Sequence, residues 1–385
     1  MKDKKYIIIS PLFPSDKSHV GSYVYDQAKA LIDVTNYDIS IIKVVSFFNF
    51  QSDYKFKGIN VKIFKVLDFP FFIFPGIFHW INSFRIKRFF KTHKLDCNLE
   101  VIHAHVCYPS VYLANVISSI VNIKVIAQHH GIDALQLLNC RFNFFRNIQR
   151  RFLKKRSLLE INKAGLNVSV SERVRRELRS FKHYYPNAEY ILYNGVDTTK
   201  FYNKKKLKHN NMYVIGCIAN FWKIKDHISL IKALELIVLE GFYDINLRLI
   251  GSGRELYKCK KYVEDNHLTS YVQFENERSH KMINNFYNEI DLFVLPSYYE
   301  ALGCVLMEAW ATDTPILSIK NQGIEELIPK EEHQNLLADE KSPRSLKEKI
   351  MGEYNRRRNF PFNDKYNIQN TITDFIKSSF FQSDV

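Results

Sequence analysis

The chain contains 385 residues, of which 46% are hydrophobic and 25% charged, a composition typical of a globular protein with core enough for two domains. Its formal net charge is +15, and nearly all the excess lies in the first half, where residues 1–197 hold 29 Lys and Arg against 15 Asp and Glu. Six cysteines without a C-x-x-C or paired spacing exclude a disulfide scaffold, and with no recognisable signal peptide they favour a cytoplasmic location.

The first half opens with a strand, a loop and a helix. Residues 6–10 form a short apolar run, a loop follows, and the apolar spacing of 23–32 predicts a helix. Gly21 comes just before that helix, where a glycine lets the backbone approach a ligand closely. Further strands are predicted at 39–45 and 61–66, so the order of elements indicates a doubly wound α/β domain.

Two segments of the first half combine basic and aromatic residues. They span 69–94 and 139–156, and the second contains seven basic residues and no acidic one. Basic amphipathic segments with aromatic residues suit the interface of an anionic membrane, although a helix packed on the core with a solvated basic face would read the same way. The residues expected to meet a membrane or an acceptor there are Arg85, Lys87, Arg88, Lys91, Arg150 and Arg151.

Histidines follow two predicted strands. One strand runs out to His103 and His105, and the next ends in His129 and His130. Ligands of doubly wound sheets bind beyond the carboxyl ends of strands, so these side chains are candidate site residues. A zinc site is not predicted, because no carboxylate or cysteine falls at ligand spacing and we expect the four rings to lie apart.

A polar, basic linker at 204–211 separates this half from a second alternation of strands and helices. We expect domains at 1–200 and 201–360, with a C-terminal helix in 361–385 that packs back on the first domain. Two such domains leave a cleft between their strand ends, which is a common place for a ligand.

The segment from Asp291 to Leu317 (DLFVLPSYYEALGCVLMEAWATDTPIL) organises the second half. It predicts a strand, a short loop and a helix that begins near Gly303. A helix N-terminus beside a strand end attracts anions, and Glu300 and Glu308 bracket this position. Amides for phosphate and carboxylates for hydroxyls would suit a nucleotide sugar, although solvated glutamates on a surface helix fit the spacing equally well.

Four motifs in the same order resemble family 4 glycosyltransferases, the "glycosyl transferases group 1". They are NGVD, IANFWKIKDH, LRLIGSGRE and the segment above. The resemblance implies a GT-B fold, in which two Rossmann-like domains face a central cleft. It also implies a retaining enzyme that takes a sugar from a nucleotide donor, without a metal or another cofactor.

The resemblance also implies roles for individual residues. Glu300 would hold hydroxyls of the donor sugar, Glu308 would hold the ribose, and Lys225 would neutralise the diphosphate as it leaves. His130 would lie near the reacting carbon as part of the H-G-x-D segment. Backbone amides around Leu302, Gly303 and Cys304 would hold the diphosphate, and Gly21, Asn220 and Gly251 are the remaining donor-binding positions.

Several positions depart from the family pattern. Asn220 stands where an arginine is usual, so one cation is missing unless Lys223 or Arg254 replaces it. Asp226 replaces a glycine, Gln322-Gly323 replaces a Gly-Gly pair, and the N-terminal loop has one glycine instead of two. Because His129 and His130 are adjacent, either could be the histidine at the donor.

We therefore predict a glycosyltransferase acting on a glycan or lipid-linked acceptor in bacterial surface polysaccharide or lipopolysaccharide synthesis, as a peripheral protein of the inner membrane face. A catalytically impaired relative that only binds sugar nucleotide is one alternative, suggested by Asn220. A nucleic-acid-binding protein is another, but the basic residues interleave with Phe and Ile without forming a recognisable module, so we expect no nucleic-acid partner.

Overall fold

The computed structural model describes residues 4–16, 18–69, 72, 74–131, 143–204, 212–278, 280–356 and 360–382. The chain forms two compact units: unit 1 comprises residues 1–195 and 368–385, and unit 2 comprises residues 196–367. The ends of these units differ from the expected domains, because residues 196–200 and 361–367 belong to unit 2. The cleft expected between the domains stays a prediction.

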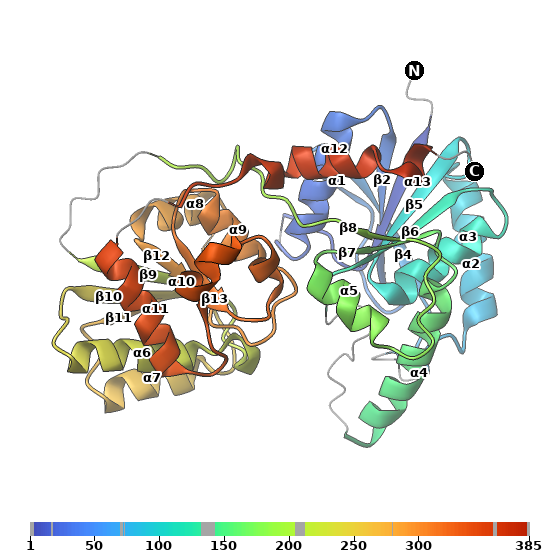
Figure 1. Ribbon diagram of the computed structural model, residues 1–385. Helices are drawn as coiled ribbons and strands as arrows, with labels where there is room; N and C mark the ends of the chain where they lie inside the picture. The colour runs from blue at the N-terminus through green and yellow to red at the C-terminus, as the bar shows by residue number, and fades with distance from the viewer. Residues whose placement is uncertain are drawn as a thin grey trace. The chain divides into compact units, whose positions relative to one another are not determined.

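Unit 1 is built on an eight-stranded sheet in the order β3-β4-β2-β1-β5-β6-β7-β8 (Figure 1). All neighbouring strands run parallel except β3 and β4, which form an antiparallel hairpin at the sheet edge. The strands are β1 (Lys5–Ser10), β2 (Asp38–Ser46), β3 (Tyr54–Phe56), β4 (Ile59–Val66), β5 (Leu99–His105), β6 (Lys124–His129), β7 (Leu166–Ser169) and β8 (Glu189–Ile191).

Helices cover the two faces of this sheet. Alternate strand residues such as Tyr6 and Ile8 pack on α1 and on the C-terminal helix α12, whose Phe375 is fully buried in the same core. On the other face α2 packs on α3, and α3 on α4 (Figure 1). The helices are α1 (Ser22–Val34), α2 (His79–Thr92), α3 (Tyr112–Ser118), α4 (Asn143–Ile161), α5 (Glu172–Arg179), α12 (Ile368–Ile376) and α13 (Ser379–Gln382).

A local sequence signal explains the start of α5. Ser171 caps this helix, since its hydroxyl accepts a hydrogen bond from the Val174 N–H at 3.2 Å. A helical turn at Cys107–Val111 follows β5 and precedes α3, and most of α3 is buried. No described helix of either unit is long and apolar enough to cross a bilayer.

Unit 2 contains a six-stranded parallel sheet in the order β11-β10-β9-β12-β13-β14. The strands are β9 (Tyr213–Ile218), β10 (Ile245–Ile250), β11 (Val272–Glu275), β12 (Leu292–Val294), β13 (Ile316–Ile319) and β14 (Leu337–Ala338). The helices are α6 (His227–Leu239), α7 (Leu256–Asp265), α8 (His280–Glu289), α9 (Cys304–Trp310), α10 (His333–Leu336) and α11 (Pro343–Arg356). Each unit thus has the predicted doubly wound α/β architecture, in which the carboxyl ends of parallel strands meet at one edge.

Candidate active site

Glu300 lies on the loop between β12 and α9, and the next loop holds its backbone on both sides. The Glu300 N–H donates to Gln322 Oε1 at 2.7 Å, and its carbonyl accepts from the Gly323 N–H at 3.2 Å. A Cβ on Gly323 would lie 1.8 Å from the Ala301 carbonyl oxygen, so no larger residue fits. The Gln322-Gly323 pair departs from the family pattern, and its two hydrogen bonds hold the Glu300 loop in place. Sequence reasoning missed that role.

Lys225 forms an ion pair with Glu300, with Nζ and Oε2 2.5 Å apart. Lys225 ends a short helical turn, Lys223–Lys225, that follows β9. The two loops are also joined through the backbone, since the Tyr298 N–H donates to the Ile224 carbonyl at 3.1 Å. Because β9 and β12 are neighbouring parallel strands, the sheet brings together two predicted site residues that are far apart in sequence.

The loop turns into α9 through Gly303, whose φ of 86° lies in the left-handed region that favours glycine. Leu302 is buried beneath the turn, and α9 begins at the partly exposed Cys304. The first amides of a helix have no partner within the helix itself, so they are available to a ligand or a cap. The three backbone positions predicted to hold the diphosphate thus form one tight turn.

Glu308 lies within α9 and accepts a hydrogen bond from the Tyr287 hydroxyl of α8 at 2.9 Å. Burial raises the pKa of Tyr287 well above its usual value, with the charge of Glu308 as a second cause, so Tyr287 remains a neutral donor. Tyr287 was not among the predicted site residues. Its buried hydroxyl fixes the orientation of the carboxylate expected to bind ribose.

Asn220 and Gly251 lie at the ends of β9 and β10. A Cβ on Gly251 would lie 2.1 Å from the Ala219 carbonyl oxygen, so the close approach of the neighbouring backbone is enough to require glycine here. Asn220 is exposed. The two cations considered as replacements for the missing arginine, Lys223 and Arg254, are also exposed and form no ion pair with a described residue.

In unit 1, Gly21 precedes α1 with a φ of 88°. A Cβ there would lie 2.6 Å from the carbonyl carbon of Leu12, so the loop packs directly on the glycine. Two residues later the Tyr23 ring lies beside His130, with ring centroids 4.7 Å apart. Gly21 and His130, both predicted site residues, therefore belong to one region of unit 1.

The prediction that the four histidines lie apart is wrong, because three of them form a stack. Residues two positions apart in a strand point to the same side of the sheet, so His103 and His105 lie on one face of β5. Their ring centroids are 4.6 Å apart. His105 Nδ1 lies 2.8 Å from His130 Nε2, since β6 is the neighbour of β5. Burial lowers the pKa of His103 to about 3, and the same cause lowers that of His105, so the stack is neutral at pH 7.

His129 and His130 occupy different surroundings. His129 is fully buried, with Nε2 2.9 Å from Asn167 Oδ1 and Nδ1 3.4 Å from the Cys107 sulfur. Burial lowers its pKa to about 4. His130 keeps part of its surface exposed, although desolvation holds its pKa below the usual range. Of the two, only His130 is accessible; Asp133, the last residue of its motif, lies outside the described residues.

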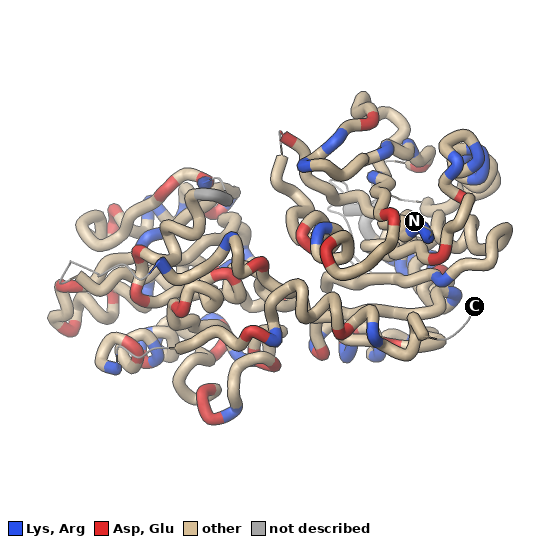
Figure 2. Tube along the Cα trace, turned by 90° about the horizontal axis from the view of Figure 1, so that it is seen from above, with Lys and Arg blue, Asp and Glu red and all other residues tan. Residues whose placement is uncertain are grey.

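The predicted membrane or acceptor residues lie on α2 and α4. Arg85, Lys87, Arg88 and Lys91 belong to α2, and Arg150 and Arg151 are exposed on α4. The start of the second basic segment, including Arg141, lies outside the described residues, as does most of the linker at 204–211. Figure 2 shows Lys and Arg crowded on one helix of unit 1, whereas unit 2 carries both signs of charge mixed along its chain.

Two family models together span most of the chain. The model for "Glycosyltransferase Family 4" matches residues 20–200, and that for "Glycosyl transferases group 1" matches residues 198–357. The chain belongs to the group 1 glycosyltransferases. It is therefore a glycosyltransferase, as the motifs of the second half predicted.

Curated relatives of this glycosyltransferase are themselves named as glycosyltransferases. An uncharacterized glycosyltransferase of Methanocaldococcus jannaschii is 28% identical over 72% of this chain and 71% of its own. A putative teichuronic acid biosynthesis glycosyltransferase of Bacillus subtilis is 24% identical over 72% of this chain and 67% of its own.

Solved structures share the fold of this glycosyltransferase. Sucrose-phosphate synthase of Thermosynechococcus elongatus matches with a TM-score of 0.68 and 14% identity, over 98% of this chain and 95% of that one. HepE of Anabaena, solved in complex with UDP, matches with a TM-score of 0.67 and 17% identity, over 96% of this chain and 94% of that one. The predicted GT-B fold is thereby confirmed.

Proposed function

We propose that this glycosyltransferase moves a sugar, with retention of its anomeric configuration, from a nucleotide-sugar donor to a glycan or lipid-linked acceptor. The setting that fits its relatives is bacterial surface polysaccharide or lipopolysaccharide synthesis. Support for a nucleotide donor comes from the UDP complex of Anabaena HepE and from the residues that gather at the strand edge of unit 2.

The observation that carries the proposal is the Lys225–Glu300 contact. It joins the loops that follow two neighbouring strands, β9 and β12, at the edge where doubly wound sheets bind their ligands. Each side chain is about one-fifth exposed, at 22% for Lys225 and 18% for Glu300, so a ligand can reach both. In the donor complex, Lys225 would turn to the diphosphate and Glu300 to the sugar hydroxyls.

The chemistry requires stabilisation of a leaving group. Breaking the bond between sugar and diphosphate builds negative charge on the phosphate oxygens, and fixed donors aimed at that charge give the largest catalytic effect. Lys225 and the amides of the turn at Gly303 would supply those donors without a metal ion or another cofactor. Glu308, held by Tyr287, would bind the ribose hydroxyls.

His130 would lie near the reacting sugar carbon. Its Nε2 already contacts His105, and its Nδ1 has no hydrogen-bond partner among the described residues. This nitrogen is buried, so the ring must shift in its packing before the neutral imidazole can exchange a hydrogen bond with a sugar hydroxyl. The accessible position beside Tyr23 makes His130, rather than His129, the residue for this role.

The protein would work at the cytoplasmic face of a membrane, as a peripheral protein. The excess positive charge of the first half and the exposed basic residues of α2 and α4 support attraction to an anionic surface. A lipid-linked acceptor would be presented at that same surface.

A donor-binding screen tests the proposal. Purified protein is heated with a panel of nucleotide sugars, and a donor should raise the melting temperature because it binds only the folded state. Nuclear magnetic resonance then identifies the first anomer released when the bound donor is slowly hydrolysed. Retention supports the proposal and inversion contradicts it. Binding without any turnover would favour the impaired relative that Asn220 suggests, and no binding at all would refute a sugar-nucleotide enzyme.

A further inference from the structure

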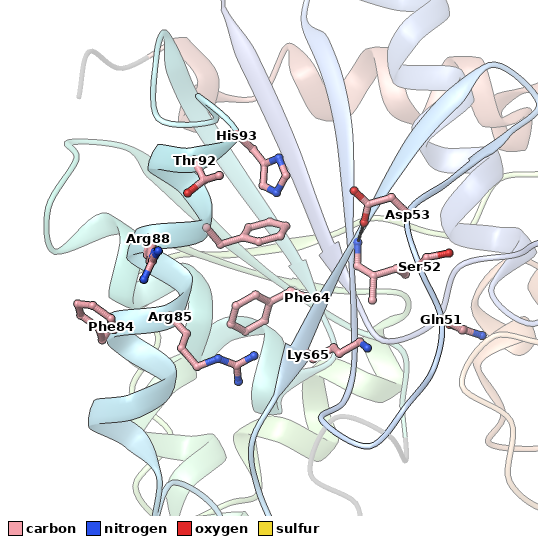
Figure 3. Close-up of a pocket in the computed structure, with 12 residues that line it drawn as sticks. Gln51, Ser52, Asp53, Phe64, Lys65, Phe84, Arg85, Arg88, Thr92 and His93 are labelled. Atoms are coloured by element: carbon pink, nitrogen blue, oxygen red, sulfur yellow. Dashed lines mark hydrogen bonds between the residues drawn. The ribbon is translucent and has the colours of Figure 1, made fainter.

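A pocket of about 780 Å³ opens at the outer part of the unit 1 sheet, between α2, β4 and residues 51–53 (Figure 3). None of the residues proposed to bind the donor or to act in catalysis lines it. In Figure 3 the side chains of α2 stand on one side and those of residues 51–53 on the other, with Phe64 and Lys65 of β4 between them. The pocket is therefore separate from the proposed donor site.

Positive charge dominates the lining. Lys65, Arg85 and Arg88 face a single carboxylate, that of Asp53. Asp53 is already engaged, because Oδ1 accepts from the Ile63 N–H at 2.7 Å and Oδ2 lies 3.8 Å from Lys62 Nζ. None of the three lining cations forms an ion pair with a described residue. This arrangement selects an anion.

The contacts around Arg85 favour the binding of such an anion. Its guanidinium lies over two aromatic rings, 5.1 Å from the centroid of Phe47 and 5.6 Å from that of Phe64, so its orientation is restrained. Its Nη1 is buried and has no hydrogen-bond partner among the described residues. A buried donor without a partner is costly, and a planar guanidinium pairs best with two oxygens of one phosphate or carboxylate.

Exposed aromatic side chains surround the pocket. Phe84 lines it and is 66% exposed, and Trp80, one helical turn earlier on α2, is 73% exposed. Phe48 and Phe50, just before the lining residues 51–53, are 71% and 99% exposed. Aromatic side chains that are exposed to water beside Lys and Arg side chains suit the boundary between lipid headgroups and acyl chains.

We propose that this pocket binds the phosphate of an anionic phospholipid headgroup, with Arg85 and Arg88 on the phosphate oxygens, Lys65 beside them, and Phe48, Phe50, Trp80 and Phe84 among the lipids. The inference rests on the membrane association in the proposed function and adds a defined headgroup site to it. Such a site recognises phosphate itself, whereas a general basic surface responds only to charge.

The test compares two vesicle types of equal surface charge and two matched variants of the full chain. Vesicles of a neutral lipid without phosphate, such as digalactosyldiacylglycerol, receive their negative charge either from phosphatidylglycerol or from a carboxylate amphiphile. Arg85→Gln with Arg88→Gln removes two charges from the pocket, and Lys87→Gln with Lys91→Gln removes two charges from the same helix outside it. Binding is measured by flotation at several salt concentrations.

We expect the wild type and the Lys87/Lys91 variant to prefer phosphatidylglycerol, and the Arg85/Arg88 variant to bind it at least about tenfold more weakly than its matched control. The preference for phosphate over carboxylate should disappear only in the pocket variant. Equal losses in both variants, or no preference in the wild type, would overturn the pocket as a phosphate site.

Two further measurements separate phosphate binding in the pocket from a folding defect and from binding of a soluble phosphate ester. If Arg85→Gln disturbs folding, as thermal unfolding would show, Lys65→Gln with Arg88→Gln tests the same pocket without changing Arg85. Soluble glycerol phosphate serves as a competitor: competition without any vesicle preference would assign the pocket to a free phosphate ester and overturn the lipid. Donor binding is measured on the wild type alone, and its absence would refute the glycosyl-transfer proposal without affecting the vesicle result.

Discussion

The carboxyl edges of the two sheets carry different chemistry although both units have the same architecture. In unit 1 the strands β5 and β6 end in a histidine stack, in which His103 and His105 are buried and desolvation lowers the pKa values of all three rings. In unit 2 the corresponding loops carry the partly exposed pair of Lys225 and Glu300. One edge is neutral at pH 7 and the other is ionic.

The difference follows from exposure. A buried imidazole loses its proton because the charged form cannot be solvated, whereas a pair of opposite charges remains ionised where water still reaches it. A leaving diphosphate needs charge, and so it suits the edge of unit 2. The neutral histidines of unit 1 can only exchange hydrogen bonds, which suits contacts with uncharged sugar hydroxyls. Substitutions at each edge should therefore have distinct consequences.

The largest effect is expected for Lys225→Ala. It removes the cation from the ionic edge, and loss of one preorganised donor to a developing negative charge typically costs about 10²–10³-fold in turnover. The turnover rate should fall by that factor while the donor Michaelis constant changes little. Steady-state kinetics with the donor identified in the screen measure both.

Lys232→Ala is the control for Lys225→Ala, since Lys232 is an exposed lysine of α6 outside the site. It should retain turnover. Equal kinetics in the two variants would show that the ionic edge of unit 2 does not stabilise the leaving group, and the contrast between the two edges would lose its functional meaning.

Gly323→Ala should have the next largest effect, because the ionic edge depends on a loop that this glycine fastens. A Cβ would lie 1.8 Å from the Ala301 carbonyl oxygen, so the Glu300 loop must move. We expect a loss of about 3 kcal/mol in the free energy of unfolding, the cost of strongly overpacked sites. Denaturant unfolding measures it, and donor binding should weaken together with it.

Gly352→Ala provides the matched control. This glycine lies within α11, and a Cβ there would meet nothing within 4 Å. Alanine should stabilise the helix by roughly 0.5–1 kcal/mol. If both variants behaved alike, the close packing of Gly323 on the Glu300 loop would not matter for stability.

Acid should affect unit 1 more than unit 2. The folded pKa of His129, about 4, lies below the unfolded value, so the folded state binds fewer protons. The neutral state of His129 contributes fully to the free energy of unfolding above about pH 6.5, and this contribution is lost as the pH falls towards 4. Protonation of His129 alone should lower the free energy of unfolding by roughly 2 kcal/mol between pH 7 and 5. The histidine stack adds to this, whereas unit 2 has one comparable residue in the described chain, His227, whose pKa burial lowers to about 4.

Unfolding free energies at several pH values test this expectation. His129→Asn removes the titrating group, and it should flatten the pH dependence by about 2 kcal/mol between pH 7 and 5 even if it lowers stability overall. Amide hydrogen exchange should show unit 1 opening before unit 2 on acidification. An unchanged slope in His129→Asn would mean that the pKa of His129 is the same in the folded and the unfolded protein.

The sequence predicted what depends on local pattern and missed what depends on register. The alternation of strands and helices and the turn at Gly303 each depend on a few adjacent residues. The hairpin of β3 and β4 was missed because its turn is Lys57-Gly58 instead of the commoner Asn-Gly or Asp-Gly, although both residues have positive φ. The histidine stack, the Tyr287 contact and the pocket beside Arg85 each join distant segments through strand pairing or helix packing.

The smallest effects are expected at Glu308 and its partner. Glu308→Ala removes the carboxylate proposed to bind ribose and should raise the donor Michaelis constant about tenfold, because a hydrogen bond to a charged group contributes roughly 1.5–3 kcal/mol. Tyr287→Phe keeps the buried ring and removes only the hydroxyl that orients Glu308. It should raise the same constant about threefold, since a neutral donor that acts through Glu308 contributes less than the carboxylate itself.

A double-mutant cycle separates the two contributions. If Tyr287 acts through Glu308, the double variant should be no worse than Glu308→Ala alone, because the hydroxyl then has nothing to orient. Additive effects on the Michaelis constant would show that Tyr287 and Glu308 meet the donor independently. An unchanged donor Michaelis constant in Glu308→Ala would show that Glu308 of α9 does not bind the donor. The proposed donor site would then rest on the Lys225–Glu300 pair.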